Sequence, residues 1–402
     1  MKINNDYNVP ILMYHSIGVP RKDWNWNYLT CPFEKFEEQL KAIKDLGLKT
    51  ISLSELYDYM VLKKKLSEAV IVITFDDGYA DIWSYAYPLL KKYNMCGTVF
   101  INPEFVDPRE ELNPLYCCDG HTAGVPTSGF LSWKEIQKMD VERVVYSESH
   151  ALTHTWYPVS EEIIDFRHPN DEYKWMTWNA HEGLKHSLQI ENFELVKLGQ
   201  PVYKNEKSLL KRRMYQDESL DAFLVDFVCK NGGHDFFQRE NYRVTLYEQV
   251  ELYRSNNSTQ VSFESEINYH ERIKHELLTS KVILEEKLDR KITFLCWPGG
   301  SATKVGMEIA RDLGYNFFNS ARDMKIEERN SIKNVLGGGD RVKRFTPIIY
   351  FNGKEDFDSK IIFANSMWMK FYFYRYTKKP LSKYWFKVIR LLANFYYKRK
   401  FK

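Results

Sequence analysis

Apolar and polar residues follow one another along much of the chain in blocks that predict buried strands. The run Ala69–Asp77 (AVIVITFDD) is apolar and β-branched at consecutive positions, which is typical of a parallel strand covered on both faces. Val9–His15, Cys96–Asn102 and Val144–Ser149 are similar runs. Each of these runs ends in polar residues, so the sequence predicts strands whose ends carry polar side chains.

Helical spacing of apolar residues separates these strands. Helices are expected at Pro32–Gly47, through Leu56–Leu62, through Leu89–Tyr93, and after Ser132, which forms a capping box with Glu135. A brief strand is expected at Ile51 and Leu53. Further on, the sequence predicts a helix at Ile273–Leu288, a strand at Lys291–Pro298, a helix at Thr303–Gly314, and late strands at Asn316–Ser320 and Arg344–Phe351.

Repeated strand-then-helix units predict an α/β fold with a parallel sheet. About seven such units favour a (β/α)7-type distorted barrel with a large insertion and a basic C-terminal helical tail. We expect the barrel to be discontinuous, at 8–157 and 256–352. The polar, aromatic-rich stretch 158–255 interrupts the rhythm and is expected to be the insertion, with the tail at 360–402.

The composition of the 402-residue chain excludes disordered and fibrous proteins, because 44% of the residues are hydrophobic and 15% aromatic. No stretch approaches the apolar length of a membrane-spanning helix. The first ten residues lack the apolar core of a secretory signal, and the six cysteines are irregularly spaced. These features predict a cytoplasmic protein with free thiols.

The net charge of +3 hides an asymmetry. Residues 361–402 carry 11 Lys or Arg and no Asp or Glu, which leaves 46 basic and 54 acidic residues in the first 360. Interleaved aromatic and basic residues favour peripheral attachment of this tail to an anionic membrane surface, on the inner face. A helix docked on the acidic body is the alternative, and no nucleic acid is expected as a partner.

Three polar clusters stand at the predicted strand ends, where α/β folds gather functional groups. They are Thr74–Tyr79 (TFDDGY), Ser149–His154 (SHALTH) and Trp297–Gly300 (WPGG).

Adjacent carboxylates at a strand end are costly unless they have different roles or share a cation. His150 and His154 are four residues apart, so that one helical turn would aim both imidazoles at one ion. Two histidines and one carboxylate leave open coordination positions, as in a catalytic metal site. An Asp-Asp pair after a strand, or two histidines four residues apart, more often serves the fold than a functional site. Because both patterns occur here directly after predicted strands, the sequence predicts that they share one site.

These stretches resemble the motifs of the polysaccharide deacetylases, carbohydrate esterase family 4. TFDDGY is similar to the first motif of the family and SHALTH to the second, and Leu12–Gly18 (LMYHSIG) is similar to the start of many members. Phe130–Met139 (FLSWKEIQKM) and the WPGG run are also similar to the family.

The resemblance implies a role for each matching residue. Asp76 would be the general base, while Asp77, His150 and His154 would bind a divalent metal, usually zinc in the family although other first-row ions are compatible. The backbone N–H of Gly299 would stabilise the oxyanion.

Tyr79, Trp297 and Pro298 are expected beside Gly299 on the substrate side of the same site. The implied substrate is a saccharide, while the sequence leaves the oligomeric state open.

The chain departs from the family at several positions. Ala151 follows the first histidine, where Ser or Thr is common, and Cys296 and Gly299 replace the usual Arg and Tyr of the third motif. No histidine follows His275, so the usual late general acid is absent. His15, at the end of the first strand, is the candidate acid.

The missing arginine has one alternative match, at Arg167–Asn170 (RHPN), which follows no predicted strand. The weaker candidates for the acid, His168, His181 and His186, lie in the same insertion.

The sequence therefore predicts a metal-dependent hydrolase that removes N-acetyl groups from a sugar within a poly- or oligosaccharide or a lipid-linked glycan. Two alternatives remain, a carbohydrate-binding pseudoenzyme and an O-deacetylase of the same fold.

Overall fold

The computed structural model describes residues 8–21, 29–117, 122–187 and 195–319, together with 341–342, 344, 346, 388 and 391–392. The predicted tail, 360–402, lies outside these residues except at 388 and 391–392. The described chain forms two compact units. The first takes its residues from Met1–Leu152, Thr279–Gly300 and Arg311–Lys402, and the second from Thr153–Leu278 and Ser301–Ala310.

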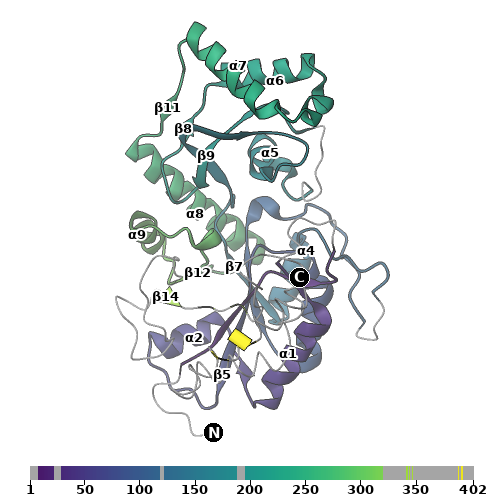
Figure 1. Cartoon of the computed structure of the whole chain (residues 1–402). Coiled ribbons are helices and arrows are strands. Elements are labelled where there is room, and N and C mark those ends of the chain that lie inside the picture. Colours follow the sequence, from purple (N-terminus) through teal and green to yellow (C-terminus); the bar gives the residue numbers. More distant parts are fainter. Residues whose placement is uncertain are drawn as a thin grey trace. The chain divides into compact units, whose positions relative to one another are not determined.

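An eight-stranded parallel sheet forms the core of the first unit (Figure 1). Its strands are β1 (Ile11–Tyr14), β4 (Lys49–Thr50), β5 (Val70–Phe75), β6 (Gly97–Ile101), β7 (Val145–Ser149), β12 (Phe294–Leu295), β13 (Phe317–Asn319) and β14 (Arg341–Val342). The order is β1-β5-β6-β7-β12-β13-β14, with β4 on β5. This curled sheet, a half-barrel, confirms the predicted α/β class.

β5 is an inner strand of the sheet, and all six of its side chains are buried. β4 pairs with its first two residues, β1 with the remaining four, and β6 with its last two from the other side. An apolar strand is stable there since neighbours cover both edges and both faces.

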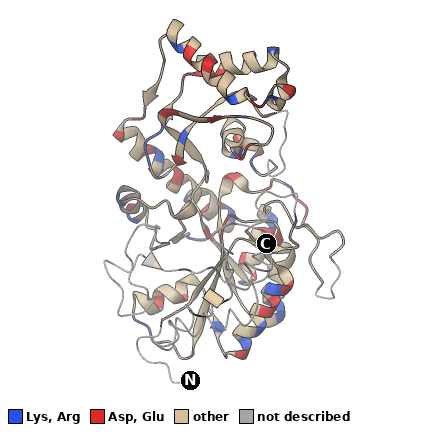
Figure 2. Ribbon diagram, in the orientation of Figure 1, with Lys and Arg blue, Asp and Glu red and all other residues tan. Residues whose placement is uncertain are grey.

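Helices follow the strands as predicted. The first unit contains α1 (Phe33–Asp45), α2 (Leu53–Met60), α3 (Tyr87–Tyr93) and α4 (Trp133–Val141). α1 buries Phe36, Leu40 and Ile43 and carries charged side chains on its other face (Figure 2). Its end is marked by Gly47, which has the positive φ of 64° that favours glycine.

Two capping boxes fix where helices begin. The predicted pair of Ser132 and Glu135 caps α4 as expected. Ser52 and Glu55 form the same motif before α2. The strand predicted at Ile51 and Leu53 is therefore wrong: the strand ends earlier, at β4, and Leu53 is the first helical residue because Ser52 satisfies the free N–H groups of the first turn.

Short elements complete the first unit. They are the parallel pair β2 (Ser16–Gly18) and β3 (Thr30–Pro32), a π-helical turn η2 (Ile82–Ala86) that runs into α3, and the 3-10 turns η3 (Pro103–Phe105) and η7 (Pro298–Gly300).

The second unit begins with a long antiparallel pair, β8 (Trp156–Phe166) and β9 (Pro201–Lys207). Its other elements are β10 (Met214–Tyr215) paired with β11 (Ser262–Phe263), the helices α5 (Lys174–Ala180), α6 (Glu218–Lys230) and α7 (Tyr242–Asn256), and the 3-10 turns η4 (Glu182–Leu184) and η6 (Gly233–Gln238). Two helices, α8 (Glu266–Leu288) and α9 (Lys304–Asp312), contribute residues to both units.

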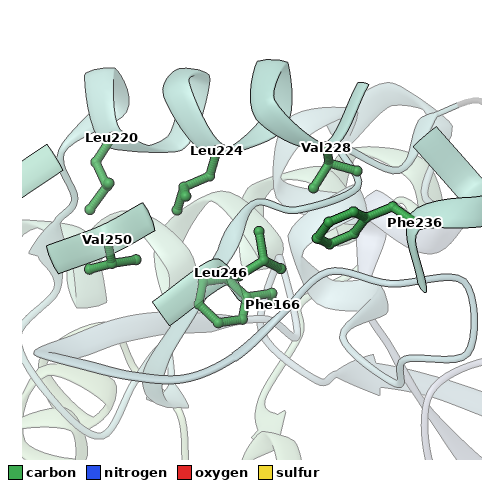
Figure 3. Packing of buried hydrophobic residues seen from close by; sticks show 7 residues of the cluster. All are labelled: Phe166, Leu220, Leu224, Val228, Phe236, Leu246 and Val250. Atoms are coloured by element: carbon green, nitrogen blue, oxygen red, sulfur yellow. The ribbon is translucent and has the colours of Figure 1, made fainter. Parts of the chain in front are cut away.

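The second unit has its own apolar core (Figure 3). Figure 3 shows α6 presenting one stripe of side chains toward α7, with the Phe166 ring of β8 beside Leu246. The cluster consists of Phe166, Leu220, Leu224, Val228, Phe236, Leu246 and Val250. The spacing of four residues within α6 and within α7 produces this stripe.

Two late strands differ from their predicted ranges. The strand expected at Lys291–Pro298 is reduced to β12, because Pro298 begins the 3-10 turn η7. β14 precedes the strand expected at Arg344–Phe351, most of which lies outside the described residues. None of the described helices combines the length and apolar character needed to cross a bilayer.

Candidate active site

The polar residues that follow the parallel strands meet at one edge of the sheet. The strand ladder continues one residue beyond the strand ends, which locks these residues side by side. The backbone bonds run from Asp76 N to Tyr14 O, from His150 N to Ile101 O and from Cys296 N to Ser149 O, each at 2.9 Å. The carboxyl ends of β1, β5, β6, β7 and β12 therefore lie together.

Asp77, His150 and His154 form a candidate metal site. Each offers one ligand atom, and these atoms lie within 4.8 Å of one another. The Asp77 Oδ1 atom is 3.2 Å from His150 Nε2. One carboxylate and two imidazoles form a donor set suited to zinc and related first-row ions.

The hydrogen bonding of His150 leaves the correct nitrogen for a metal. Its Nδ1 atom is 2.7 Å from the backbone oxygen of Cys296, which can only accept, so Nδ1 carries the proton. Nε2, which faces Asp77, is therefore the nitrogen that could give up its proton and bind a cation. A carbonyl partner of this kind fixes the ring of a metal-binding histidine.

The charges around His150 also favour a cation. Burial opposes the charged imidazole, but Cys296, Asp77 and Asp76 outweigh burial and raise the pKa of His150 well above its usual value. The buried ring therefore lies in surroundings that stabilise positive charge. Together with the donor set, this shows that the residues present fit a divalent cation.

The loop from His150 to His154 contains no helical turn, so the predicted helical presentation of the two imidazoles is wrong. Left-handed backbone conformations turn the chain instead, with φ of 60° at Ala151 and 42° at His154. Asp77 has a φ of 72°. Three of the seven non-glycine residues with positive φ in the described chain thus lie at this site, where such strain is commonly found.

Asn102, directly after β6, supports this loop. Its side-chain amide donates to the backbone oxygen of His150 and, at 3.3 Å, to that of Ala151. The sequence analysis did not identify Asn102, although its position at a strand end, like that of Asp76, could have indicated it.

Asp76 is paired with an arginine that the sequence analysis missed. The Arg344 guanidinium donates from Nη1 to Oδ1 at 2.6 Å and from Nη2 to Oδ2 at 2.7 Å. Both side chains are almost completely buried. Burial acts to raise the pKa of Asp76, but Arg344, with help from His150 and His15, lowers it below the usual value. Asp76 is therefore held as an oriented carboxylate.

Arg344, and not the residue at position 296, places an arginine beside Asp76. Its guanidinium also donates to Thr74 Oγ1 at 3.1 Å and lies 3.0 Å from the Cys296 Sγ atom. The smaller Cys296 side chain thus stands beside the arginine that comes from the segment after β14. No local motif around Arg344 marks it.

A second group of possible ligands, Asp76, His150 and Cys296, also lies within 4.8 Å. Arg344 already contacts both the Asp76 carboxylate and the Cys296 sulfur. A metal there would be placed against a fixed positive charge, so the group that contains Asp77 and His154 is the better cation site.

The alternative arginine, Arg167, is committed elsewhere. Its Nε donates to Asp171 Oδ2 at 2.7 Å, and its Nη1 lies 3.3 Å from Thr177 Oγ1, all within the second unit. The arginine partner of Asp76 is Arg344, so the match at Arg167–Asn170 does not supply it.

His15 follows β1 and lies within electrostatic range of Asp76, whose pKa it helps to lower. Of the candidate substrate residues, Tyr79 is 4% exposed and stacks on Phe130 with ring centroids 5.3 Å apart. Trp297 is 1% exposed and Pro298 is also buried, so these three side chains belong to the core. Gly299 forms a left-handed turn with a φ of 53°.

Comparisons with known proteins find similarity to deacetylases, as the sequence motifs predicted. Residues 63–188 match the family model described as polysaccharide deacetylase. A Bacillus subtilis (strain 168) protein, named provisionally as the polysaccharide deacetylase YxkH, is 41% identical over 112 residues. That alignment covers 28% of this chain and 38% of the relative.

The poly-β-1,6-N-acetyl-D-glucosamine N-deacetylase of Escherichia coli (strain K12) is 19% identical over 281 residues. This alignment covers 70% of the chain and 29% of the relative, so the chain spans well under half the length of either curated relative. A solved de-N-acetylase from Aggregatibacter actinomycetemcomitans has the same fold, with a TM-score of 0.50, 17% identity, and coverage of 84% of this chain and 94% of that one.

Proposed function

We propose that this chain is a metal-dependent N-deacetylase of the polysaccharide deacetylase family, whose model it matches. Its substrate would be an N-acetylated sugar within a poly- or oligosaccharide or a lipid-linked glycan. One observation carries the proposal: two adjacent carboxylates have separate partners. Asp76 is held by Arg344, whereas Asp77 faces His150.

This separation supports two different roles. Asp76, kept ionised and oriented by Arg344, would take the proton from the water that attacks the acetyl carbonyl. Asp77, His150 and His154 would hold the divalent cation, for which zinc is the first candidate. When bound, such a cation supplies Lewis-acid polarisation of the acyl oxygen and lowers the pKa of water.

The remaining steps need a donor for the oxyanion and an acid for the leaving amine. The backbone N–H of Gly299 is our candidate for the oxyanion donor, by resemblance to the family. The water oxygen bonds to the acyl carbon, Asp76 accepts one proton, and the C–N bond breaks as His15 protonates the nitrogen. Acetate and a free amino sugar leave.

Acetate release from N-acetylated and O-acetylated oligosaccharides tests the proposal. Release from the amide substrate, lost in Asp76→Asn, is expected. Release from the ester alone would favour the O-deacetylase, and binding of a saccharide without release from either would favour the pseudoenzyme.

We further propose that residues 361–402 attach the protein to the inner face of an anionic membrane. The support is their content of 11 basic and no acidic residues. Co-sedimentation with phosphatidylserine vesicles at low salt tests this proposal, with a variant truncated after residue 360 as the control. A full-length protein that stays in the supernatant would rule out the attachment.

A further inference from the structure

The second unit contains a cavity of about 800 Å³ to which no role has been assigned. This volume lies in the usual range for small-molecule sites. None of the residues of the candidate active site lines it. The residues that matter for its chemistry are Tyr157, Gln200, Arg213, Tyr215, Gln216 and Asp221.

One face of α6 forms a wall of the cavity. Ala222, Val225 and Cys229 line it at helical spacing, together with Asp221. The adjacent face of the same helix carries the apolar stripe that packs in the core of the unit (Figure 3). The wall is thus anchored by that core, and the cavity does not depend on a loose loop.

Asp221 is buried with its charge incompletely satisfied. It is 8% exposed, and its Oδ2 atom accepts from the side-chain amides of Gln200, at 2.8 Å, and Gln216. Its Oδ1 atom is buried and has no hydrogen-bond partner among the residues that the structure describes. A buried oxygen of this kind is costly unless a ligand supplies a donor.

Burial raises the pKa of Asp221 to about 6, even though both glutamines and the nearby Lys197 lower it. The pKa of Asp221 therefore lies close to neutral pH, so that a small fall in pH neutralises the carboxylate. A cationic donor at Oδ1 would relieve this cost, whereas an anion would increase it.

The other charges of the lining are balanced. Glu218 lines the cavity with Lys197 and Arg213, and Asp226 also lines it but is paired with Lys230 at 2.7 Å. Asp221 is therefore the carboxylate that argues for a cationic ligand.

Arg213 contacts two of the aromatic rings that line the cavity. Its guanidinium carbon lies 4.4 Å from the ring centre of Tyr157 and 5.0 Å from that of Tyr215. Both rings lie within cation–π distance of this guanidinium, while its buried Nε has no hydrogen-bond partner among the described residues.

Aromatic surface stands beside the carboxylates. Tyr215 is 42% exposed although it lines the cavity, so part of the side chain remains open to a ligand. The C–H face of a pyranose ring is apolar and packs against aromatic faces, while its substituents hydrogen-bond at the edge.

We propose that this cavity binds an amino sugar, with its ammonium group at the Asp221 carboxylate and its ring against Tyr215. An amino sugar is the group that de-N-acetylation produces, so the choice of ligand rests on the proposed function. The second unit would then bind the deacetylated part of a saccharide, the product rather than the substrate.

Calorimetric titration of the full chain tests the proposal with three probes. Methyl β-D-glucosaminide carries the ammonium and the ring, methyl N-acetyl-β-D-glucosaminide carries the ring alone, and ethylamine carries the ammonium alone. The glucosaminide is expected to bind tightest of the three. Loss of a charge-assisted hydrogen bond in Asp221→Asn should weaken it by about 10- to 100-fold.

Two further variants keep the test independent of folding defects. Tyr215→Ala changes a partly exposed side chain and should also weaken glucosaminide binding. Glu248→Gln removes an exposed carboxylate on α7, outside the cavity, and should leave binding unchanged. Equal binding of ethylamine and the glucosaminide, unchanged binding in Asp221→Asn, or no glucosaminide binding by the wild-type protein would each overturn the proposal.

Acetate release, measured on the same proteins, separates this proposal from the proposed function. Asp221→Asn should still release acetate from a short N-acetylated substrate. A wild-type protein that binds the glucosaminide through Asp221 but releases no acetate would contradict the deacetylase function and leave the amino-sugar site standing.

Discussion

The Arg344 guanidinium holds both carboxylate oxygens of Asp76, at 2.6 and 2.7 Å, across 268 residues of chain. A two-point pair of this kind fixes the orientation of the carboxylate as well as its charge. Asp77 lies next to Asp76 but faces His150. The two neighbouring carboxylates therefore have different partners, which suits the two roles proposed for them, general base and metal ligand. This relationship gives the proposed mechanism its base.

Replacing Arg344 should damage catalysis and stability together. Arg344→Ala leaves Asp76 as a buried, unpaired charge, which is expected to cost about 3–5 kcal/mol of stability. Acetate release should fall by about 100-fold or more, since base catalysis contributes about that much. Arg344→Lys retains the charge without the two-point geometry. Its stability and its rate of acetate release should lie between those of the wild type and Arg344→Ala. Steady-state kinetics and thermal unfolding measure both effects.

A matched control for Arg344 is Arg290→Lys. Arg290 makes a comparable two-point pair with Asp140, at 2.8 and 2.7 Å, without contacting Asp76. The Arg290→Lys substitution should lower stability but leave the kcat of the folded enzyme near that of the wild type. A similar kcat loss in Arg344→Lys and Arg290→Lys would contradict the specific role of Arg344.

Removal of the imidazoles should remove the metal. His150→Ala and His154→Ala are each expected to lower metal affinity by about tenfold or more, because each deletes one of three ligands. Metal content by mass spectrometry and zinc titration of the chelator-treated protein report this directly. His270→Ala, an exposed position on α8, is the control. Unchanged zinc affinity in both site variants would place the metal elsewhere.

The role of His15 can be tested with substrates that differ in the leaving group. An amine must be protonated to leave, whereas a nitrophenolate leaves unaided. His15→Ala should therefore lower amide hydrolysis by about 100-fold while changing p-nitrophenyl acetate hydrolysis far less. Parallel assays of both substrates measure the ratio, and an equal loss on both would exclude His15 as the acid.

Asp221 should make stability depend on pH in an unusual direction. Its pKa rises from 3.8 to about 6 in the folded chain because of burial. Between these values the folded state binds more protons than the unfolded state, so this group reduces stability as the pH rises through that window. The shift corresponds to about 3 kcal/mol.

Denaturant titrations of the wild type and Asp221→Asn at pH 4 and pH 7 measure this contribution. Asp221→Asn should gain stability relative to the wild type between these two values, since it lacks the group that titrates. The exposed Glu248→Gln variant should show no such gain. If the difference between wild type and Asp221→Asn is the same at both pH values, Asp221 does not carry the cost of a buried charge.

Arg167 is expected to serve the fold alone. Arg167→Ala breaks the buried pair with Asp171 and should destabilise the second unit by about 3–5 kcal/mol. The kcat for acetate release should stay near that of the wild type below the unfolding temperature. A selective loss of kcat in a folded Arg167→Ala protein would revive its candidacy as a catalytic arginine.

Features that depend on a few neighbouring residues could be predicted from the sequence alone. The apolar run of β5 requires a buried parallel strand, and the pair of Ser132 and Glu135 begins a helix wherever that helix packs. Asp76, Asp77 and His150 follow strands directly, so they were predicted to meet at a sheet edge. Burial patterns and caps act over one or two turns, which is why local sequence encodes them.

Tertiary structure alone decided the relationships that join distant segments. Arg344 has no local signal, because its partner is selected by the strand order that places β14 in the same sheet as β5. The spacing of His150 and His154 fits a helix, yet Asn102 and left-handed residues hold a loop instead. The Asp221 cavity likewise exists only after α6 packs on its own core. Contacts across long stretches of chain depend on topology, and no short pattern of residues records it.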